Sequence, residues 1–297
     1  MDPRRLEMLL ELSRLGSMRE VAETLHVTTS TVSQQVAALS REVRQPLVEP
    51  VGRRVRLTPA GRRLADHAVT ILAAVEAARV DLDPSAEPAG LVRVASFSTA
   101  IRGALLPAVR VLAERHPDVR VQILEHEPPE AFAMLAADEV DLALTYDYNL
   151  APATIDRTLQ ASSLGETEWA LGVPSAAGRG RGDALETFRR FRDQDWIVAS
   201  RNTADGDAVR TVASMAGFQA RVVHQADSLE LVQDLIAAGL GVGLLPARQP
   251  VKRGVGLRRL RDPAVVLRGY AVTRRGRADW PPLALLLRLL GDLRLTP

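Results

Sequence analysis

The sequence predicts a multi-domain α+β fold, in which a small helical unit with a β-hairpin and one long helix precede a larger α/β part with two lobes. Two observations predict this class. Helical and hairpin patterns crowd the first 60 residues, and beyond a Pro-rich break strands and helices alternate to the C-terminus. The length of 297 residues also exceeds what one average core requires.

Composition and charge exclude several classes of protein. The chain is 46% hydrophobic and 25% charged, which is typical of globular proteins, and the lack of cysteine excludes disulfide scaffolds and thiolate sites. No apolar run reaches the roughly 18 residues of a membrane span, and the charged N-terminus does not match a signal peptide. We therefore expect a cytoplasmic protein without a membrane partner. The net charge of +2 divides into +3 for residues 1–80, −9 for 81–250 and +8 for 251–297.

The first elements form a helix-turn-helix pattern. A helix with leucines at helical spacing begins at Pro3 and ends at Gly16. Ser17 and Glu20 form a capping box that begins a short second helix, and Thr28 caps a third helix after a tight connection. Two short helices joined by so brief a turn are typical of a DNA-binding unit.

The polar face of the third helix carries short hydroxyls and amides, which can bind phosphate or read base edges in the major groove. Residues 48–57 then predict a hairpin wing with arginines placed to reach phosphate. The plainer alternative is a Ser/Thr-rich capped helix without a ligand. The candidate DNA-binding residues are Ser17, Thr28, Thr29, Ser30, Thr31, Ser33, Gln34, Arg53, Arg54 and Arg56.

A long amphipathic helix follows the wing. Thr58 caps it and Pro59 occupies its first turn. The apolar residues Leu64, Ala68, Ile71, Val75 and Ala78 recur at heptad-like spacing, which is typical of a dimerisation helix. Packing against its own chain is the alternative.

In these features the sequence resembles the LysR-type transcriptional regulators. The residues that carry the resemblance are Gly16-Ser17, Ala22, Leu25, Thr28 to Ser33, Leu39 and Leu57 to Gly61. It departs from the family at Ser40, where a glutamate is usual, and in the segment 43–50, which lacks the usual glycine, phenylalanine and arginine.

Beyond the Pro-containing linker at 84–90, strands and helices alternate, which predicts a parallel α/β sheet in each half. The predicted strands are 91–96, 119–124, 141–145, 169–173, 196–199, 220–223, 242–245 and 267–273. The predicted helices are 101–116, 129–137, 207–216, 228–238 and 281–293.

This part resembles the bilobed, periplasmic-binding-protein-like effector domain of the same family. The matching segments are His116-Pro117, Val140 to Leu144 and Ala238 to Pro246. The resemblance implies a winged helix-turn-helix domain at 1–60, a linker and dimerisation helix with a hinge at 61–90, and an effector domain at 91–297. Within the last, lobe I covers about 91–165 and 267–297, and lobe II about 166–266.

Loops at the carboxyl ends of the strands are where an open α/β sheet binds its ligand. The candidate effector-binding residues are Ser96, Ser98, Thr99, His126, Tyr146, Asp147, Arg201, Asn202, Asp227 and Ser228. Each of them could instead serve as a cap, a turn or a surface polar group. Arg201 and the helix N-termini suggest an anionic effector, whereas Asp147 argues against one.

The function predicted from these features is a DNA-binding transcription regulator of LysR type that responds to a small-molecule effector. Enzyme motifs are lacking, the five histidines have no metal-ligand spacing, and no cofactor or metal is expected. A free solute-binding protein does not explain the helix-turn-helix. The alternative is an architectural DNA-binding protein with a vestigial effector domain. Expected partners are a pseudo-palindromic site on double-stranded DNA, the effector, further copies of the chain as a dimer or tetramer, and RNA polymerase. The basic residues of 251–277 have two open explanations, DNA bending or pairing with the acidic middle across a subunit interface.

Overall fold

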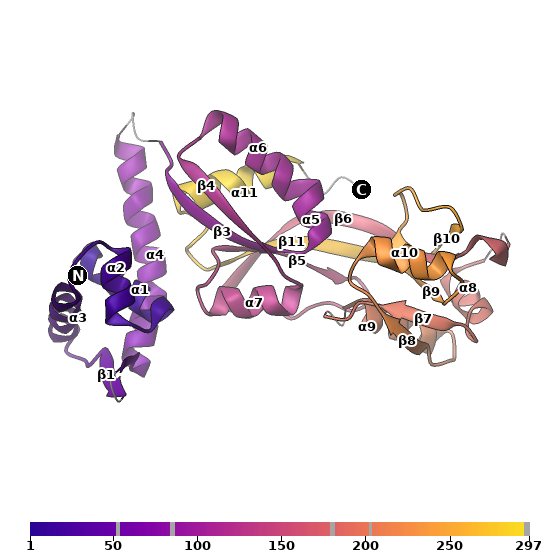
Figure 1. Ribbon diagram of the computed structural model, residues 1–297, viewed down its shortest axis with the longest axis horizontal. Helices are drawn as coiled ribbons and strands as arrows, with labels where there is room; N and C mark the ends of the chain where they lie inside the picture. The colour runs from indigo at the N-terminus through magenta and orange to yellow at the C-terminus, as the bar shows by residue number, and fades with distance from the viewer. Residues whose placement is uncertain (52–53, 84–86, 179–181, 202–203, 294–297) are drawn as a thin grey trace.

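The computed structural model describes residues 1–51, 54–83, 87–178, 182–201 and 204–293. Its N-terminal unit holds three helices, α1 (Pro3–Leu15), α2 (Met18–Thr24) and α3 (Thr29–Val43). The unit lies against the long helix α4 (Pro59–Leu82), at one end of an elongated molecule whose other end is a large sheet covered by helices (Figure 1).

Side chains cap these helices as the sequence predicts. Gly16 ends α1 with φ of 65°, the left-handed conformation that glycine adopts without strain. Ser17 and Thr28 accept hydrogen bonds from the backbone N–H groups of Glu20 and Thr31. Apolar side chains from all three helices form a core that is separate from the core of the sheet.

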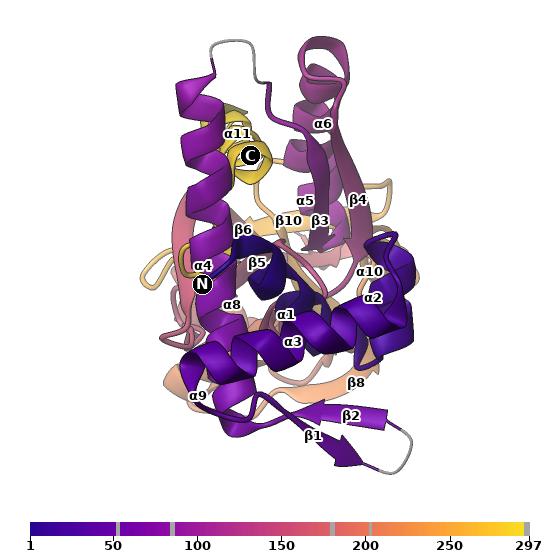
Figure 2. The ribbon, with the colours of Figure 1, turned by 90° about the vertical axis from the view of Figure 1, so that its left-hand side faces the viewer.

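The wing and the start of α4 form one packed unit. The hairpin consists of β1 (Val48–Val51) and β2 (Arg54–Leu57), with Arg53 outside the described residues. Figure 2 shows it projecting beside α3. Thr58 caps α4 by accepting from Gly61 N–H at 3.0 Å, and its hydroxyl donates to the Pro46 carbonyl at 2.6 Å.

Helix α4 packs on its own chain along one face. Its buried residues include Ala65, Ala68, Val69 and Ala73, which lie towards α1. The side chain of Val75, one of the residues predicted to form a dimer contact, is 46% exposed. One face of α4 is therefore packed within the chain, and the other is open. The dimer contact stays a prediction for the open face.

The larger part is built on one mixed sheet of nine strands in the order β4-β3-β5-β11-β6-β9-β7-β8, with β10 paired to β6. The strands are β3 (Gly90–Ser96), β4 (Val119–Glu125), β5 (Leu142–Tyr148), β6 (Leu159–Pro174), β7 (Asp195–Val198), β8 (Arg221–Gln225), β9 (Val242–Pro246), β10 (Val255–Arg259) and β11 (Val265–Arg274).

The prediction of a parallel sheet is correct only within each half. Strands β4, β3 and β5 are parallel, and so are β8, β7 and β9. Between these triplets run β11 and β6, each antiparallel to its neighbours. The first half of the 16-residue β6 is rich in exposed polar residues, which is why the sequence pattern revealed only its apolar end at 169–173.

Helices cover both faces of each half (Figure 1). In the first half, one face carries a continuous helical segment formed by α5 (Ser98–Ala100), a π-helical turn (Ile101–Leu105) and α6 (Leu106–Arg115), together with α11 (Pro281–Leu293). The opposite face carries α7 (Pro128–Ala136). In the second half, α10 (Leu229–Ala237) covers one face, and α8 (Ala184–Arg190) and α9 (Ala204–Met215) cover the other. The sequence patterns missed the short elements α8 and β10.

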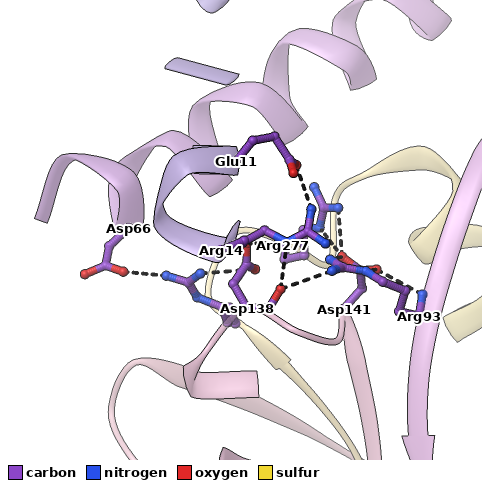
Figure 3. A network of polar contacts seen from close by, with 8 residues as sticks. Glu11, Arg14, Asp66, Arg93, Asp138, Asp141 and Arg277 are labelled. Atoms are coloured by element: carbon purple, nitrogen blue, oxygen red, sulfur yellow. Dashed lines mark hydrogen bonds and ion pairs between the residues drawn. The ribbon is translucent and has the colours of Figure 1, made fainter. Parts of the chain in front are cut away.

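A network of ion pairs joins the N-terminal unit to the sheet (Figure 3). Arg14 of α1 pairs with Glu11 at 2.6 Å and donates through Nε to the Asp138 carbonyl at 3.1 Å. Arg93 Nη1 donates to the same carbonyl at 3.1 Å. Asp141, which is 2% exposed, accepts from Arg93 at 3.0 Å and from Arg277 at 2.8 Å. Burial raises the pKa of Asp141, but the hydrogen bonds from Arg93 and the charge of Arg277 outweigh it and keep that pKa low.

The same network accounts for part of the basic C-terminal run. Arg274 pairs with Asp138 at 3.1 Å and with Asp66 of α4 at 2.5 Å. Arg268 pairs with Asp147 at 2.8 Å and Lys252 with Asp234 at 2.5 Å. These basic residues thus pair with acidic residues of their own chain, and the two explanations raised for the run, DNA bending and pairing across a subunit interface, stay predictions.

Candidate functional site

The exposed face of α3 is the first candidate site. Val32, Val36 and Leu39 are buried against the other helices, so the helix presents its opposite face to solvent. On that face Thr29, Ser33 and Gln34 are exposed and make no hydrogen bond to another described residue. Short polar side chains with unused donors and acceptors on an exposed helix can contact the edges of base pairs.

Other candidate DNA-binding residues have partners within the unit. Thr28 Oγ1 lies 2.8 Å from the hydroxyls of both Ser30 and Thr31, so these three form a cap at the start of α3. Arg56 pairs with Glu49 across the wing at 2.7 Å, in an exposed pair of the kind that contributes little stability and leaves the guanidinium available to a phosphate. Arg53 lies outside the described residues, as does the side chain of Arg54.

A small cavity, partly open to solvent, lies where the two halves of the sheet meet. It is lined by Phe97, Ser98, Thr99, Glu127, Tyr146, Trp169, Ala199, Asp205, Asp227, Leu229 and Leu267. Four of the candidate effector-binding residues are therefore brought together: Ser98, Thr99, Tyr146 and Asp227. They come from the carboxyl ends of β3, β5 and β8, as the rule for open α/β sheets predicts.

The remaining candidates lie elsewhere or act through others. Ser96 is fully buried and donates to the Phe97 carbonyl at 3.3 Å. Asp147 is 3% exposed and is held by Arg268, because consecutive residues of a strand point to opposite faces and its neighbour Tyr146 takes the cavity side. Ser228 caps α10, and Asn202 lies outside the described residues.

Arg201 and His126 lie beside the cavity, and both contact the carboxylate of Glu130. Arg201 Nε donates to Asp227 at 3.2 Å, and its Nη1 lies 3.7 Å from Glu130. His126 Nδ1 lies 3.2 Å from the same Glu130 oxygen. Because Arg201 and Asp227 follow strands of one half whereas Glu130 begins α7 of the other, these contacts bridge the two halves.

Among the seven lining residues that sequence reasoning missed, Glu127, Asp205 and Trp169 carry polar groups. Glu127 is one residue beyond His126, which was chosen instead, and Asp205 lies at the start of the helix after β7. Both obey the same rule of loops that follow strands, so that rule applied more widely would have found them. The sequence indicates Trp169 only as the first residue of a predicted strand.

The electrostatics of the cavity are set by carboxylates. Burial raises the pKa of Asp205 to about 7, against the effect of the Tyr148 hydroxyl, and the charges of Glu127 and Asp227 raise it further. Burial also raises the pKa of Glu127, although the Tyr146 hydroxyl donates to that carboxylate at 3.1 Å. Asp227 keeps a low pKa, since hydrogen bonds from Ser200 and Arg201 outweigh its partial burial. This composition does not match the anionic effector that the sequence suggested.

Within the described part of the chain, no group of three or more acidic or histidine side chains is arranged to hold a metal ion. None of the helices described there combines the length and the apolar character that crossing a bilayer requires.

Family models match both the N-terminal unit and the larger part of the chain. The family model for bacterial regulatory helix-turn-helix proteins of the lysR family matches residues 3–62, and the model for the LysR substrate binding domain matches residues 85–294. The HTH-type transcriptional regulator IlvR of Caulobacter vibrioides is 28% identical over 303 residues, 98% of each chain.

Solved structures show the same fold. A full-length variant of OxyR from Pseudomonas aeruginosa superposes with a TM-score of 0.71 at 19% identity, covering 99% of this chain and 94% of the other. Full-length CbnR, a structure solved with its target DNA, gives a TM-score of 0.53 at 19% identity over 99% of this chain and all of the other.

Proposed function

Because the chain belongs to the LysR family of bacterial transcriptional regulators, we propose that it binds a pseudo-palindromic promoter site through α3 and that a small molecule in the cavity between the two halves changes this binding. As a member of the family it is a DNA-binding regulator with a helix-turn-helix domain and an effector-binding domain. The proposed domains are a winged helix-turn-helix domain at residues 1–60, a linker and dimerisation helix with a hinge at 61–90, and an effector-binding domain at 91–297.

The observation that carries this proposal is the exposed polar face of α3. Thr29, Ser33 and Gln34 have no partner among the described residues, and helix dipole and cap together favour a phosphate at its N-terminus. In this arrangement Gln34 reads a base edge in the major groove, while Arg54 and Arg56 of the wing contact the backbone.

Two copies of the chain pair through the open face of α4. Val75 is 46% exposed and Leu82 is 82% exposed on a helix of 24 residues, which is a long apolar edge for a surface helix. Pairing would place two α3 helices about one helical turn of DNA or a multiple of it apart, so a symmetric protein meets a symmetric site. Contacts between effector domains then assemble dimers into a tetramer, and RNA polymerase is a further partner of the DNA-bound form.

Effector control follows from the position of the cavity. Its lining comes from both halves, so a ligand that contacts both favours one angle between them. The binding free energy that differs between the two arrangements is the only energy available to shift the spacing of the DNA-binding units.

The proposal is tested by mapping bound DNA across the genome and titrating salt on the best site. We expect a footprint of paired half-sites, and affinity that falls steeply with salt because phosphate contacts release counterions. Binding that is weak and indifferent to sequence would point instead to an architectural role with a vestigial effector domain.

Gln34→Ala is the sharper test of α3. We expect the preference for the specific site over random DNA to fall about tenfold or more, since one good base contact contributes roughly 1–3 kcal/mol of discrimination. Weak, salt-sensitive binding should persist. Gln122→Ala, the same change at an exposed position of β4, serves as the matched control. Unchanged sequence preference in the Gln34 variant would remove this residue from the interface.

A further inference from the structure

The charge balance of the cavity between the two halves is negative. Glu127, Asp205 and Asp227 line it, and Glu130 stands at its edge. The nearest arginine, Arg201, is committed to Asp227 at 3.2 Å and lies 3.7 Å from Glu130. Its charge is thus shared by one carboxylate of each half, Asp227 and Glu130, and neither Glu127 nor Asp205 lies within ion-pair distance of it.

The two remaining carboxylates differ in their surroundings. Glu127 is 7% exposed, and its side chain accepts from the Tyr146 hydroxyl and from the backbone N–H of Glu130 in the capping box of α7. Asp205 is partly buried. Asp205 Oδ1 is inaccessible to solvent and has no hydrogen-bond partner among the described residues. A buried carboxylate without a partner costs free energy, and it is stabilised by a proton or by a cation placed beside it.

Aromatic and apolar side chains form the rest of the wall. Phe97 and Tyr146 pack edge to face with ring centroids 4.7 Å apart, and Trp169 also lines the cavity. Trp169 is 8% exposed, and its indole N–H has no partner among the described residues. Carboxylates beside aromatic faces are the combination that binds organic cations, because ring faces and carboxylates both attract positive charge.

A second cavity continues from the first and shares five of its lining residues. It adds Ala100, Gly103, Thr167, Pro246 and Gln249, none of which carries a charge. The combined space can therefore take a charged group at the acidic end and an apolar body at the other.

We propose that the effector of this regulator is a small organic cation, with a protonated nitrogen seated between Glu127 and Asp205 and an apolar body that extends past Trp169. The inference rests on the proposed function of the cavity. It excludes a simple carboxylate as effector, because an anion would add to three carboxylates that Arg201 only partly neutralises.

The pH dependence of binding follows from the groups that face Asp205. These are Glu127 before α7, Asp227 after β8 and Tyr148 on β5. A bound cation favours the ionised form of Asp205. Below about pH 7, where this carboxyl is mostly protonated, binding must therefore displace its proton. Affinity should consequently be lower in acid, whereas an alkylammonium stays charged across this range.

The test compares three probes of one shape by calorimetry on the full chain: 2-phenylethylamine, 2-phenylethanol and 3-phenylpropionate. We expect the amine to bind most tightly at pH 8, and on the order of tenfold more weakly at pH 5.5. Glu127→Gln and Asp205→Asn should each weaken amine binding about tenfold or more, while Asp193→Asn, which removes an equal charge from an exposed pair on the surface, should not.

Preference for the carboxylate or the alcohol, or failure of the amine to bind at millimolar concentration, would overturn the inference. Equal amine affinity in the Asp205→Asn and Asp193→Asn variants would overturn it as well, once circular dichroism shows both folded. If the cavity prefers the carboxylate while the chain still binds a specific site on DNA, the inference of a cationic effector is overturned but the proposed function stands. Loss of specific DNA binding under all conditions would contradict the proposed function itself.

Discussion

At the scale of single residues, Asp205 couples the cavity to the stability of the fold. Its carboxyl has a pKa of about 7 in the folded chain, above the ordinary value of 3.8, so the folded state holds this proton more tightly than the unfolded state does. Binding of that proton stabilises the folded state to its full extent below about pH 4, and this contribution is lost as the pH rises to about 7.

Asp205→Asn should therefore stabilise the protein in a pH-dependent manner. The gain in the free energy of unfolding should be small near pH 4 and grow towards pH 7 by at most roughly 1.4 kcal/mol per pH unit. Urea titrations of both proteins at pH 4.5, 6 and 8 measure it. A constant difference at all three values would show that Asp205 does not titrate in this range.

The residue scale also shows where sequence reasoning succeeds. Ser17, Thr28 and Thr58 were predicted as caps and are caps, because capping depends on a few neighbouring residues. Glu127 and Asp205 were missed, although their position after strands makes each of them a candidate. That they meet in one cavity depends on how distant strands and helices pack, and the sequence does not show it.

At the scale of elements, the junction between the wing and α4 depends on a close backbone approach. A Cβ at Gly61 would lie 2.0 Å from the Leu47 carbonyl oxygen, in the turn where Thr58 caps the helix. No side chain rotation relieves this contact, because the neighbour is backbone.

Gly61→Ala should consequently destabilise the N-terminal unit by about 3 kcal/mol. Gly291→Ala is the matched control, since an added Cβ there meets open space in α11, and it should be neutral or stabilise by roughly 0.5–1 kcal/mol. Thermal unfolding followed by circular dichroism distinguishes them. Equal melting temperatures of the two variants would mean that the backbone at the junction of the wing and α4 accommodates the added Cβ without loss of stability.

Elements with strong periodicity were predicted well, and weakly patterned ones were not. The helices α6 and α11 and the apolar strands β3 and β5 were found near their actual bounds, because a buried face imposes its period on the sequence. Strand β10 pairs only with β6, outside the main order of the sheet, and α8 has just seven residues. Neither is long enough to show a period.

At the scale of the whole molecule, the ion-pair network fixes how the N-terminal unit sits on the sheet. Arg14 reaches from α1 to both the carbonyl and the carboxylate of Asp138, and its side chain is 24% exposed. Partly buried contacts of this kind contribute more than exposed pairs.

Arg14→Gln should loosen the N-terminal unit without unfolding either core. Spin labels on cysteines introduced at the exposed positions Ser13 and Arg120 report the distance directly, because the chain has no cysteine of its own. We expect a broader distance distribution in the variant. Arg19→Gln, which removes an exposed pair within α2, should leave it unchanged. Identical distributions in both variants would show that other contacts hold the unit in place.

Strand β11 connects the two sites described above. Leu267 near its start lines the cavity, and Arg274 at its end holds Asp66 of α4. The segment between them is about 24 Å long in extended conformation and is hydrogen-bonded on both sides, so it resists compression and bending. Its pairing with β5 is continuous, and the register shift between Gly269 and Tyr270 lies on the β6 side, where Leu164 is the extra residue. One uninterrupted covalent segment therefore links the lining of the cavity to the ion pair that holds α4, and a displacement of Leu267 would have a direct path to Arg274.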